Sequence, residues 1–322
     1  MLDLLSDILT RLSMRGTLYF RTSFSKPWGV CVPSFENVAR FHYAHRGACK
    51  VRVKATDEVV SVEQGDLIII PHGASHDLFY DHEAETAVKP LDTVLEDSGY
   101  DGSGVLVYGG NSEPSSETQL ICGHFSFEPT SRHILFDRLP PLVHVKNYGE
   151  TAGKWMEATL RVIGDEAGGK RMGGDLIALK MSEAILAQAI RAFLESGAGA
   201  KYGLGGFADE KLCLSLDAFH KSPQQTWSVE ALARVAGMSR TSFAVAFQKQ
   251  MEITPMEYVT GWRMEIAKQA LLDTTNTLTD VAEKAGYASD SAFTRVFKKE
   301  TGSTPAAFRK KSLNVRTLER SA

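Results

Sequence analysis

Residues 228–258 read SVEALARVAGMSRTSFAVAFQKQMEITPMEY, and residues 278–308 repeat the pattern as LTDVAEKAGYASDSAFTRVFKKETGSTPAAF. In each copy a glycine ends the first apolar run, at Gly237 and at Gly286. A serine follows two residues later in the first copy and three residues later in the second. Glycine permits a left-handed turn, and serine caps the N-terminus of a helix. The repeat therefore predicts two helix-turn-helix units.

A phenylalanine pair in each copy supports this prediction. Phe243 and Phe247 in the first copy match Phe293 and Phe297 in the second. Residues four apart share one face of a helix, so each pair should anchor the second helix to a core and leave its other face exposed. The segment 258–274 should form one helix that links the two units. An ordinary array of helical hairpins is the alternative, but it does not require all these features twice.

The repeat resembles the DNA-binding part of the AraC/XylS family of bacterial regulators. Its signature stands here as Gly286, Phe293, Phe297 and T-P-x-x-F at residues 304–308. The resemblance to this part covers residues 214–310. It implies that two recognition helices enter successive major-groove segments of double-stranded DNA, and that the protein regulates transcription.

Carried over by position, the resemblance implies a set of DNA-contacting residues on the two recognition helices. They are Arg240, Thr241, Ala244, Val245 and Gln248 in the first, and Asp290, Ser291, Thr294, Arg295 and Lys298 in the second. Ala244 and Val245 can touch thymine methyl groups only, whereas Arg295 is the best candidate for a guanine contact. Basic residues nearby should contact phosphates or be solvated, namely Lys298, Lys299, Arg309, Lys310 and Lys311.

The first ~145 residues carry short β-type runs with Gly, Pro, Asn and Asp between them, which predicts an all-β barrel or sandwich. A short amphipathic helix should precede these strands at the N-terminus. Residues 81–118 are expected to be a long loop, and residues 154–166 and 175–196 to be helices. The glycine-rich segment 197–206 is expected to be a flexible linker.

Residues 65–76 fit the spacing G-x5-P-x-G-x2-H and resemble the second motif of cupin barrels. The first cupin motif is incomplete, since Arg40 stands about where its glutamate should be. His42 and His76 remain as two metal-ligand candidates, so the resemblance allows a divalent metal in the barrel. Two hydrogen-bonded core histidines are the alternative. Cys122 and His124 alternate onto one strand face and are candidates for binding an effector or an oxidant, although a buried, inert thiol is common.

Composition limits the remaining possibilities. The net charge is −3 over 322 residues, and basic residues exceed acidic ones only in the C-terminal part. The sequence contains no apolar run of ~20 residues, so no membrane partner is expected. The four cysteines, Cys31, Cys49, Cys122 and Cys213, form no metal or disulfide motif, which favours a reducing cytoplasm. No nucleophile triad, P-loop or dinucleotide fingerprint appears, so an enzyme is not expected.

The sequence thus predicts an α+β protein with two domains. Residues 1–206 should form a cupin-like regulatory and dimerisation domain with a helical pair, and residues 207–322 a double helix-turn-helix domain. The predicted function is sequence-specific transcription regulation gated by a small effector, a metal or an oxidant. Expected partners are DNA, a second copy of the chain and RNA polymerase. A cupin metalloenzyme tethered to DNA and a DNA-binding architectural protein are the alternatives.

Overall fold

The fold was analysed in a computed structural model. It describes residues 3–12, 14–81, 88–102, 104–110, 117–127, 133–147, 158–159, 162 and 172–319. The chain forms two compact units. The sheet unit comprises Met14–Glu128 and Leu139–Ser196, and the helical unit comprises Met1–Ser13, Pro129–Arg138 and Gly197–Ala322.

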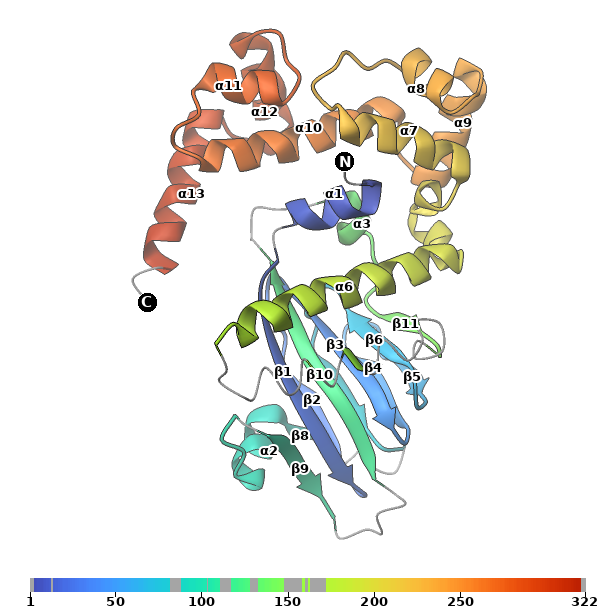
Figure 1. The fold of residues 1–322 in the computed structure, drawn as a ribbon, viewed down its shortest axis with the longest axis vertical. Coiled ribbons are helices and arrows are strands. Elements are labelled where there is room, and N and C mark those ends of the chain that lie inside the picture. The colour runs from blue at the N-terminus through green and yellow to red at the C-terminus, as the bar shows by residue number, and fades with distance from the viewer. Residues whose placement is uncertain are drawn as a thin grey trace. The chain divides into compact units, whose positions relative to one another are not determined.

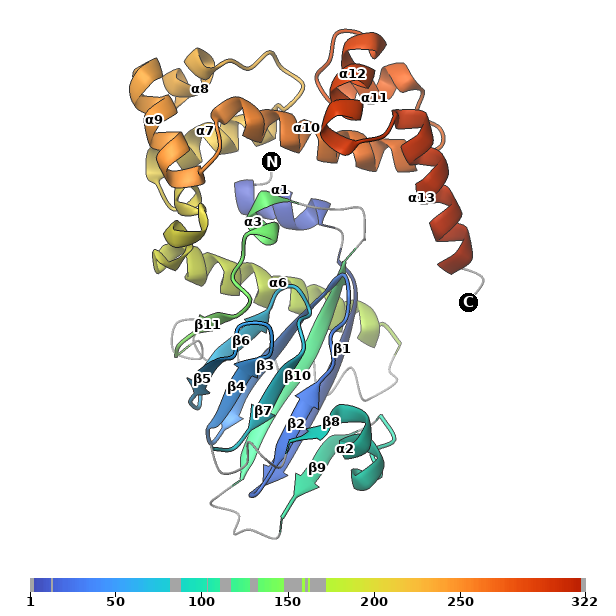
Figure 2. The same cartoon turned by 180° about the vertical axis from the view of Figure 1, so that it is seen from behind.

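The sheet unit contains two β-sheets, which Figures 1 and 2 show from opposite sides. The six-stranded sheet has the order β11-β6-β3-β10-β1-β9, formed by Val143–Val145, Leu67–Ile70, Val38–Arg46, Thr118–Phe127, Met14–Ser25 and Val105–Gly109. The five-stranded sheet has the order β5-β4-β7-β2-β8, formed by Glu58–Val62, Cys49–Val53, His76–Phe79, Gly29–Val32 and Lys89–Pro90.

Apolar side chains from both sheets form one core in this unit. Trp28, Val51, Ile68 and Leu120 are all at most 1% exposed. The β-rich cupin-like domain is therefore confirmed, with the described strands arranged as two sheets and not as a closed barrel. The alternation of buried and less buried residues along β4 shows the expected two-residue period.

The expectation of a long loop at residues 81–118 is wrong. The described part of this segment contains β8, helix α2 (Leu91–Ser98) and β9. Val94 of α2 and Leu106 of β9 are fully buried. The few apolar residues of this polar segment therefore suffice to hold a short helix and an edge strand on the core.

Helix α6 (Gly174–Glu195) confirms the helix expected at residues 175–196. It packs against β1 and β11, and it crosses the six-stranded sheet in Figure 1. Ile185, Ala189 and Ile190 of this helix are buried. The helix expected at residues 154–166 falls almost entirely outside the described residues.

The helical unit confirms both helix-turn-helix units. They are α8 (Val229–Val235) with α9 (Arg240–Met251), and α11 (Leu278–Lys284) with α12 (Asp290–Thr301). Helix α7 (Glu210–Lys221) precedes the first unit, α10 (Pro255–Leu272) links the two, and α13 (Pro305–Glu319) follows the second. The turn glycines have φ of +63° at Gly237 and +74° at Gly286. This conformation favours glycine because it lacks a Cβ.

The two phenylalanine pairs lie in the cores as predicted. Phe243, Phe247, Phe293 and Phe297 are at most 1% exposed. Ser239 and Ser289 cap α9 and α12, each accepting a hydrogen bond from the backbone N–H three residues on. The expected linking helix is α10, which extends from a Thr254–Glu257 capping box.

The predicted N-terminal helix is confirmed as α1 (Leu4–Arg11), but it belongs to the helical unit. Helix α3 (Ile134–Asp137), which follows β10 in the sequence, belongs there too. This division by contacts differs from a boundary at residue 206, which assigns both helices to the regulatory domain.

The expectation of a flexible linker at residues 197–206 is wrong. Two 3-10 helices, η3 (Ala198–Tyr202) and η4 (Gly205–Phe207), form there, and Leu204 is fully buried. A Cβ on Gly206 would lie 2.5 Å from Sδ of Met251, which is itself fully buried in α9. The glycines therefore permit close packing against α9.

We expect Gly206→Ala to lower the free energy of unfolding by roughly 1–3 kcal/mol, because the added methyl overpacks the contact with Met251. The matched control is Gly261→Ala in α10, where a Cβ would meet nothing within 4 Å. This control should raise stability by up to about 1 kcal/mol, since alanine favours a helix interior. Urea unfolding of the full chain measures both, and equal effects would contradict the packing role.

Candidate functional site

The second helices of the two repeats, α9 and α12, present the predicted DNA-contacting residues on their outer faces. On α9, Arg240, Thr241, Val245 and Gln248 are exposed and Ala244 is half-buried. On α12, Ser291, Arg295 and Lys298 are exposed, and Asp290 and Thr294 are half-buried. Each helix therefore has one face buried through its phenylalanine pair and one face free for a partner.

The first residues of these helices make equivalent contacts in the two repeats. Arg240 forms an ion pair with Glu230 of α8. Thr279 of α11 donates a hydrogen bond of 3.0 Å to Asp290. Each contact joins the start of the second helix to the first helix of its unit at an exposed position.

Arg309 has a different role from the one expected. Its Nε donates to the carbonyl of Leu271 at 3.0 Å, and its Nη2 donates to that of Asn276 at 2.8 Å. The guanidinium therefore satisfies the carbonyl of Leu271 in the last turn of α10, as basic side chains near helix C-termini often do, and that of Asn276 in the segment before α11. This structural role replaces the expected phosphate contact or solvated charge.

In the sheet unit, His42, His76 and Cys122 are brought together in the core. His42 Nε2 lies 2.7 Å from His76 Nε2, and His42 Nδ1 lies 3.1 Å from Cys122 Sγ. His76 Nδ1 lies 2.8 Å from the carbonyl oxygen of Ala74. His42 and Cys122 are neighbours because β3 pairs with β10 in this register.

The partners assign every proton in this chain of contacts. A carbonyl only accepts, so His76 Nδ1 donates to Ala74 and His76 Nε2 is an acceptor. His42 Nε2 must then donate to His76, which leaves His42 Nδ1 to accept from the Cys122 thiol. The arrangement is a linear series of hydrogen bonds that runs from the protonated Cys122 thiol through two neutral imidazoles to the carbonyl of Ala74.

The electrostatics agree with this protonation pattern. Burial lowers the pKa of His76 to about 4, and it lowers the pKa of His42 well below its usual value. Burial raises the pKa of the Cys122 thiol. These directions follow from the cost of placing a charge in a low-dielectric interior.

The described residues do not fit a metal ion. Cys122 and His76 occupy opposite nitrogens of the His42 ring, so the three cannot ligate one ion. The charge of Arg40, where a metal cupin would supply a carboxylate, also disfavours a cation. Across the described ranges, no three His, Cys, Asp or Glu residues are grouped to hold a metal. The geometry is that of two core histidines that are hydrogen-bonded to each other.

Arg40 and His124 lie beside this series. They face each other in the β3–β10 register. Arg40 is 8% exposed, its Cζ lies 4.6 Å from the ring centroid of Phe35, and its Nε has no hydrogen-bond partner. His124 is half-buried, and burial followed by the charge of Arg40 lowers its pKa. The structure does not place His124 in hydrogen-bond contact with Cys122.

A second buried cluster lies in the helical unit, around Tyr258 of α10. The Tyr258 hydroxyl lies 2.8 Å from His220 Nε2 and 3.2 Å from His133 Nε2. His220 Nδ1 donates to Asp7 of α1 at 2.9 Å. His133 Nδ1 accepts from the backbone N–H of Leu135, so His133 Nε2 donates to Tyr258, and Tyr258 in turn donates to His220.

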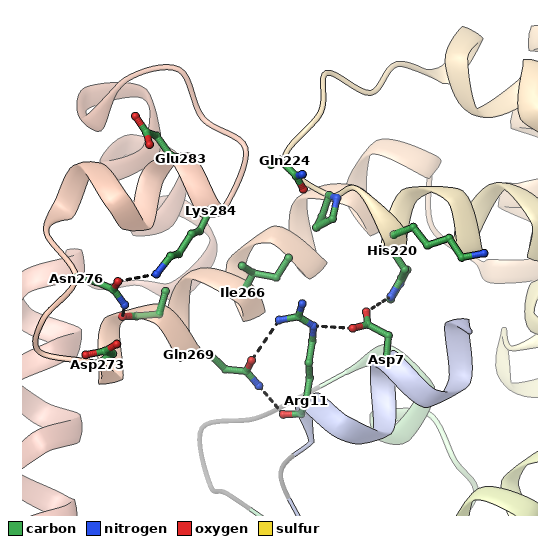
Figure 3. A pocket seen from close by; sticks show the side chains of 13 residues that line it. Asp7, Arg11, His220, Gln224, Ile266, Gln269, Asp273, Asn276, Glu283 and Lys284 are labelled. Atoms are coloured by element: carbon green, nitrogen blue, oxygen red, sulfur yellow. Dashed lines mark hydrogen bonds and ion pairs between the residues drawn. The ribbon is translucent and has the colours of Figure 1, made fainter. Parts of the chain in front are cut away.

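A cavity of about 830 Å³ adjoins this cluster, and Figure 3 shows the side chains that line it. Arg11 of α1 bonds both Asp7 and Gln269 of α10 there. These contacts attach α1 to α7 and α10. The sequence gives no local signal for them, because Asp7 and His220 are 213 residues apart.

A β-rich unit combined with two helix-turn-helix units on one linking helix defines a two-part DNA-binding protein. Residues 3–195 match the Cupin family, and residues 232–311 match a family described as a helix-turn-helix domain.

Relatives that are similar over nearly the whole chain are described as AraC-like or HTH-type transcription regulators. An AraC-like transcription regulator of Streptomyces lividans is 32% identical over 96% of this chain and 98% of its own. One of Streptomyces antibioticus is 30% identical over 96% and 99%. RclR of Escherichia coli K12, an RCS-specific HTH-type transcriptional activator, is 24% identical over 96% and 98%. The chain belongs to the AraC family of DNA-binding transcription regulators that carry a cupin domain.

Acid should destabilise the protein through the neutral histidines. Between about pH 6.5 and pH 4 the unfolded chain binds a proton at residue 76 that the folded chain does not, so stability falls as pH falls. From pH 7 to pH 5 this one group contributes a loss of about 2 kcal/mol. We therefore expect the free energy of unfolding, measured with urea, to fall between pH 7 and pH 5 by about 2 kcal/mol less in His76→Gln than in wild type. An identical loss would contradict a neutral buried His76.

Proposed function

We propose that this regulator reads DNA with the exposed faces of α9 and α12 and that its cupin domain controls this binding. The observation that supports the first part is the pair of outer faces, each held by a buried phenylalanine pair and a serine cap. In double helix-turn-helix proteins such faces lie in the major groove.

The two helices differ in what they can read. The centre of the α9 face carries Ala244 and Val245, which offer only apolar contact with thymine methyl groups. Arg240 forms an ion pair with Glu230, so Glu230 already balances part of the charge that Arg240 could offer to DNA. On α12, Arg295 is exposed and has the donor pair that recognises guanine. We assign the stronger base reading to α12, and phosphate contact to Lys298.

The control by the cupin domain is assigned to a small effector. An oxidant would need a reactive thiolate, but the Cys122 thiol is 2% exposed and burial raises its pKa. A metal would need ligands that the described residues do not assemble. A small molecule that contacts His42, Cys122 or their neighbours requires neither a reactive thiolate nor a set of metal ligands.

The route from the cupin domain to DNA runs along the chain itself. Strand β1 begins directly after α1, and β10 ends a few residues before His133. These strands pair with each other, with Met14 opposite Phe127. Both continuations contribute to the Tyr258 cluster, through Asp7 and His133. A change in β10 can therefore alter the support of α10 and of the first DNA-binding unit.

The remaining partners follow from this role. As a transcription regulator the chain would act in the cytoplasm on chromosomal DNA and contact RNA polymerase there. The described helices include none long and apolar enough to span a membrane. The regulatory part, residues 1–206, would also form the homodimer contact, with residues 207–322 binding DNA.

We expect Arg295→Ala to cost roughly 1–3 kcal/mol of binding at an operator guanine and to remove the preference for that base. Lys298→Ala on the same helix is the matched control. It should weaken binding to operator and random DNA equally, because a phosphate contact carries no sequence information. Fluorescence anisotropy with both DNAs measures this. An equal loss on both DNAs for Arg295→Ala would make it a phosphate contact.

The gating is tested in the full chain with operator DNA and a panel of candidate metabolites. We expect His76→Gln and Cys122→Ala to bind the operator like wild type without a compound, but to lose most of the response to the active compound. Cys213→Ala, a half-buried cysteine of α7, should respond like wild type. If both sheet-unit variants also respond like wild type, the sensor lies elsewhere.

A homodimer should form through α6. Its N-terminal turns expose Leu176 (61%) and Ile177 (42%), outside the contact with the sheet. We expect Ile177→Glu to shift the full chain from dimer to monomer in sedimentation equilibrium at micromolar concentration. Leu214→Glu, at an exposed leucine of α7, is the control and should leave the mass unchanged. A monomeric wild type would contradict the assignment.

A further inference from the structure

Helix α10 is shared by the two helix-turn-helix units (Figures 1 and 2). Its first half packs in the first unit, where the ring of Tyr258 lies 6.0 Å from that of Phe247. Its second half contributes Met264 and Leu271 to the core that holds the phenylalanine pair of α12. A shared helix can bend, so the mutual orientation of the two units also depends on contacts made beside the helix.

Arg263 lies on α10 between these two halves and makes one such contact with the first unit. Its Nε donates to the carbonyl of Pro223 at 3.0 Å, and its Nη2 donates to that of Gln225 at 2.6 Å. Both carbonyls belong to the segment between α7 and α8. Trp227 holds this segment on the first core, because its ring lies 6.1 Å from that of Phe219. The charged donor strengthens both hydrogen bonds to this segment.

The same guanidinium contacts the turn of the second unit. Its Cζ lies 5.8 Å from the centroid of the Tyr287 ring, within the range of a cation–π contact. A Cβ on Gly286 would lie 2.9 Å from Nη2 of Arg263 and 3.0 Å from Cα of Gln224. The ring of Tyr287 lies 5.7 Å from that of Phe293 in α12. Arg263 therefore joins a segment of the first unit to the turn that precedes the second recognition helix.

The first repeat shows that a turn of this kind does not itself require such close packing. Its equivalent glycine, Gly237, has a φ of +63°, close to the +74° of Gly286. Both positions need the left-handed conformation that glycine permits. A Cβ on Gly237 would nevertheless meet nothing within 4 Å. The close approach at Gly286 is therefore a feature of the contact between the two units.

We propose that Arg263 is a positioning residue that sets the distance and rotation between the two recognition helices. It thereby selects the number of base pairs between the two DNA segments that one chain reads. It acts through Gly286 and Tyr287 and not by contact with a base. Each inserted base pair rotates the second segment by about 34° relative to the first, away from a helix held in a fixed position. This inference rests on the proposed reading of DNA by both α9 and α12.

The test measures fluorescence anisotropy of the full chain with DNA that carries the two segments one chain protects. The segments keep their native spacing or have one or two base pairs inserted between them. We expect wild type to bind the altered DNAs at least about ten-fold more weakly. In Arg263→Ala this ratio should fall to about two-fold, because the second unit can then turn to follow its segment. Arg263→Lys, which keeps the charge without the planar fork, should give an intermediate ratio.

The matched control is Arg309→Ala. Arg309 also donates through Nε and Nη2 to two carbonyls, but those of Leu271 and Asn276 adjoin the second unit only. This variant loses the same kind of bonds and should keep the wild-type ratio. A wild type that binds all spacings equally would contradict the reading by two helices and, with it, this inference. If wild type discriminates but Arg263→Ala keeps the full ratio, or Arg309→Ala loses it equally, this inference alone is overturned.

Discussion

The buried hydroxyl of Tyr258 is the constraint on which the helical unit depends. A buried polar group must be hydrogen-bonded, and Tyr258 finds its acceptor in His220 and its donor in His133. His220 is in turn held by Asp7 of α1. Two segments that flank the sheet strands in sequence thus complete the core beneath the first helix-turn-helix unit. Removing either segment would leave a buried donor or acceptor without a partner, at a cost of about 1–3 kcal/mol.

The same rule explains the interior of the sheet unit. His42, His76 and Cys122 satisfy one another in a series that ends at the carbonyl of Ala74. The cupin spacing retains the histidines, but Arg40 reverses the local charge from the one that a metal requires. The positive charge of Arg40 therefore makes this part of the sheet unit unsuited to a metal cation.

The DNA-binding unit could be predicted almost completely from the sequence, because the residues that determine its fold act locally. A turn glycine, a capping serine and two phenylalanines four residues apart act within one or two helical turns, and a repeat doubles the signal. The exposed faces of α9 and α12 follow from the same period. The hydrogen bonds of Tyr258 could not be predicted, because they join residues whose separation is fixed only by the tertiary fold.

The predictions that rested on composition alone were wrong for two segments. Residues 197–206 have the glycine content of a flexible linker, yet these glycines permit contact with Met251 and Gln250 of α9. Residues 81–118 are polar, yet Val94 and Leu106 anchor their described part to the core. Arg40 was visible in the sequence as a departure from the cupin motif. The absence of a hydrogen-bond partner for its Nε depends on neighbours that only the tertiary fold brings together.

The central claim is that one chain reads DNA with two helices on a common linking helix. Base-resolution footprinting of the full chain, on operators found by genome-wide mapping, tests it most directly. We predict that each chain protects two major-groove segments about 10 base pairs apart on one face of the DNA, with the stronger sequence preference in one of them. Protection of a single segment, or occupancy without sequence preference, would contradict it.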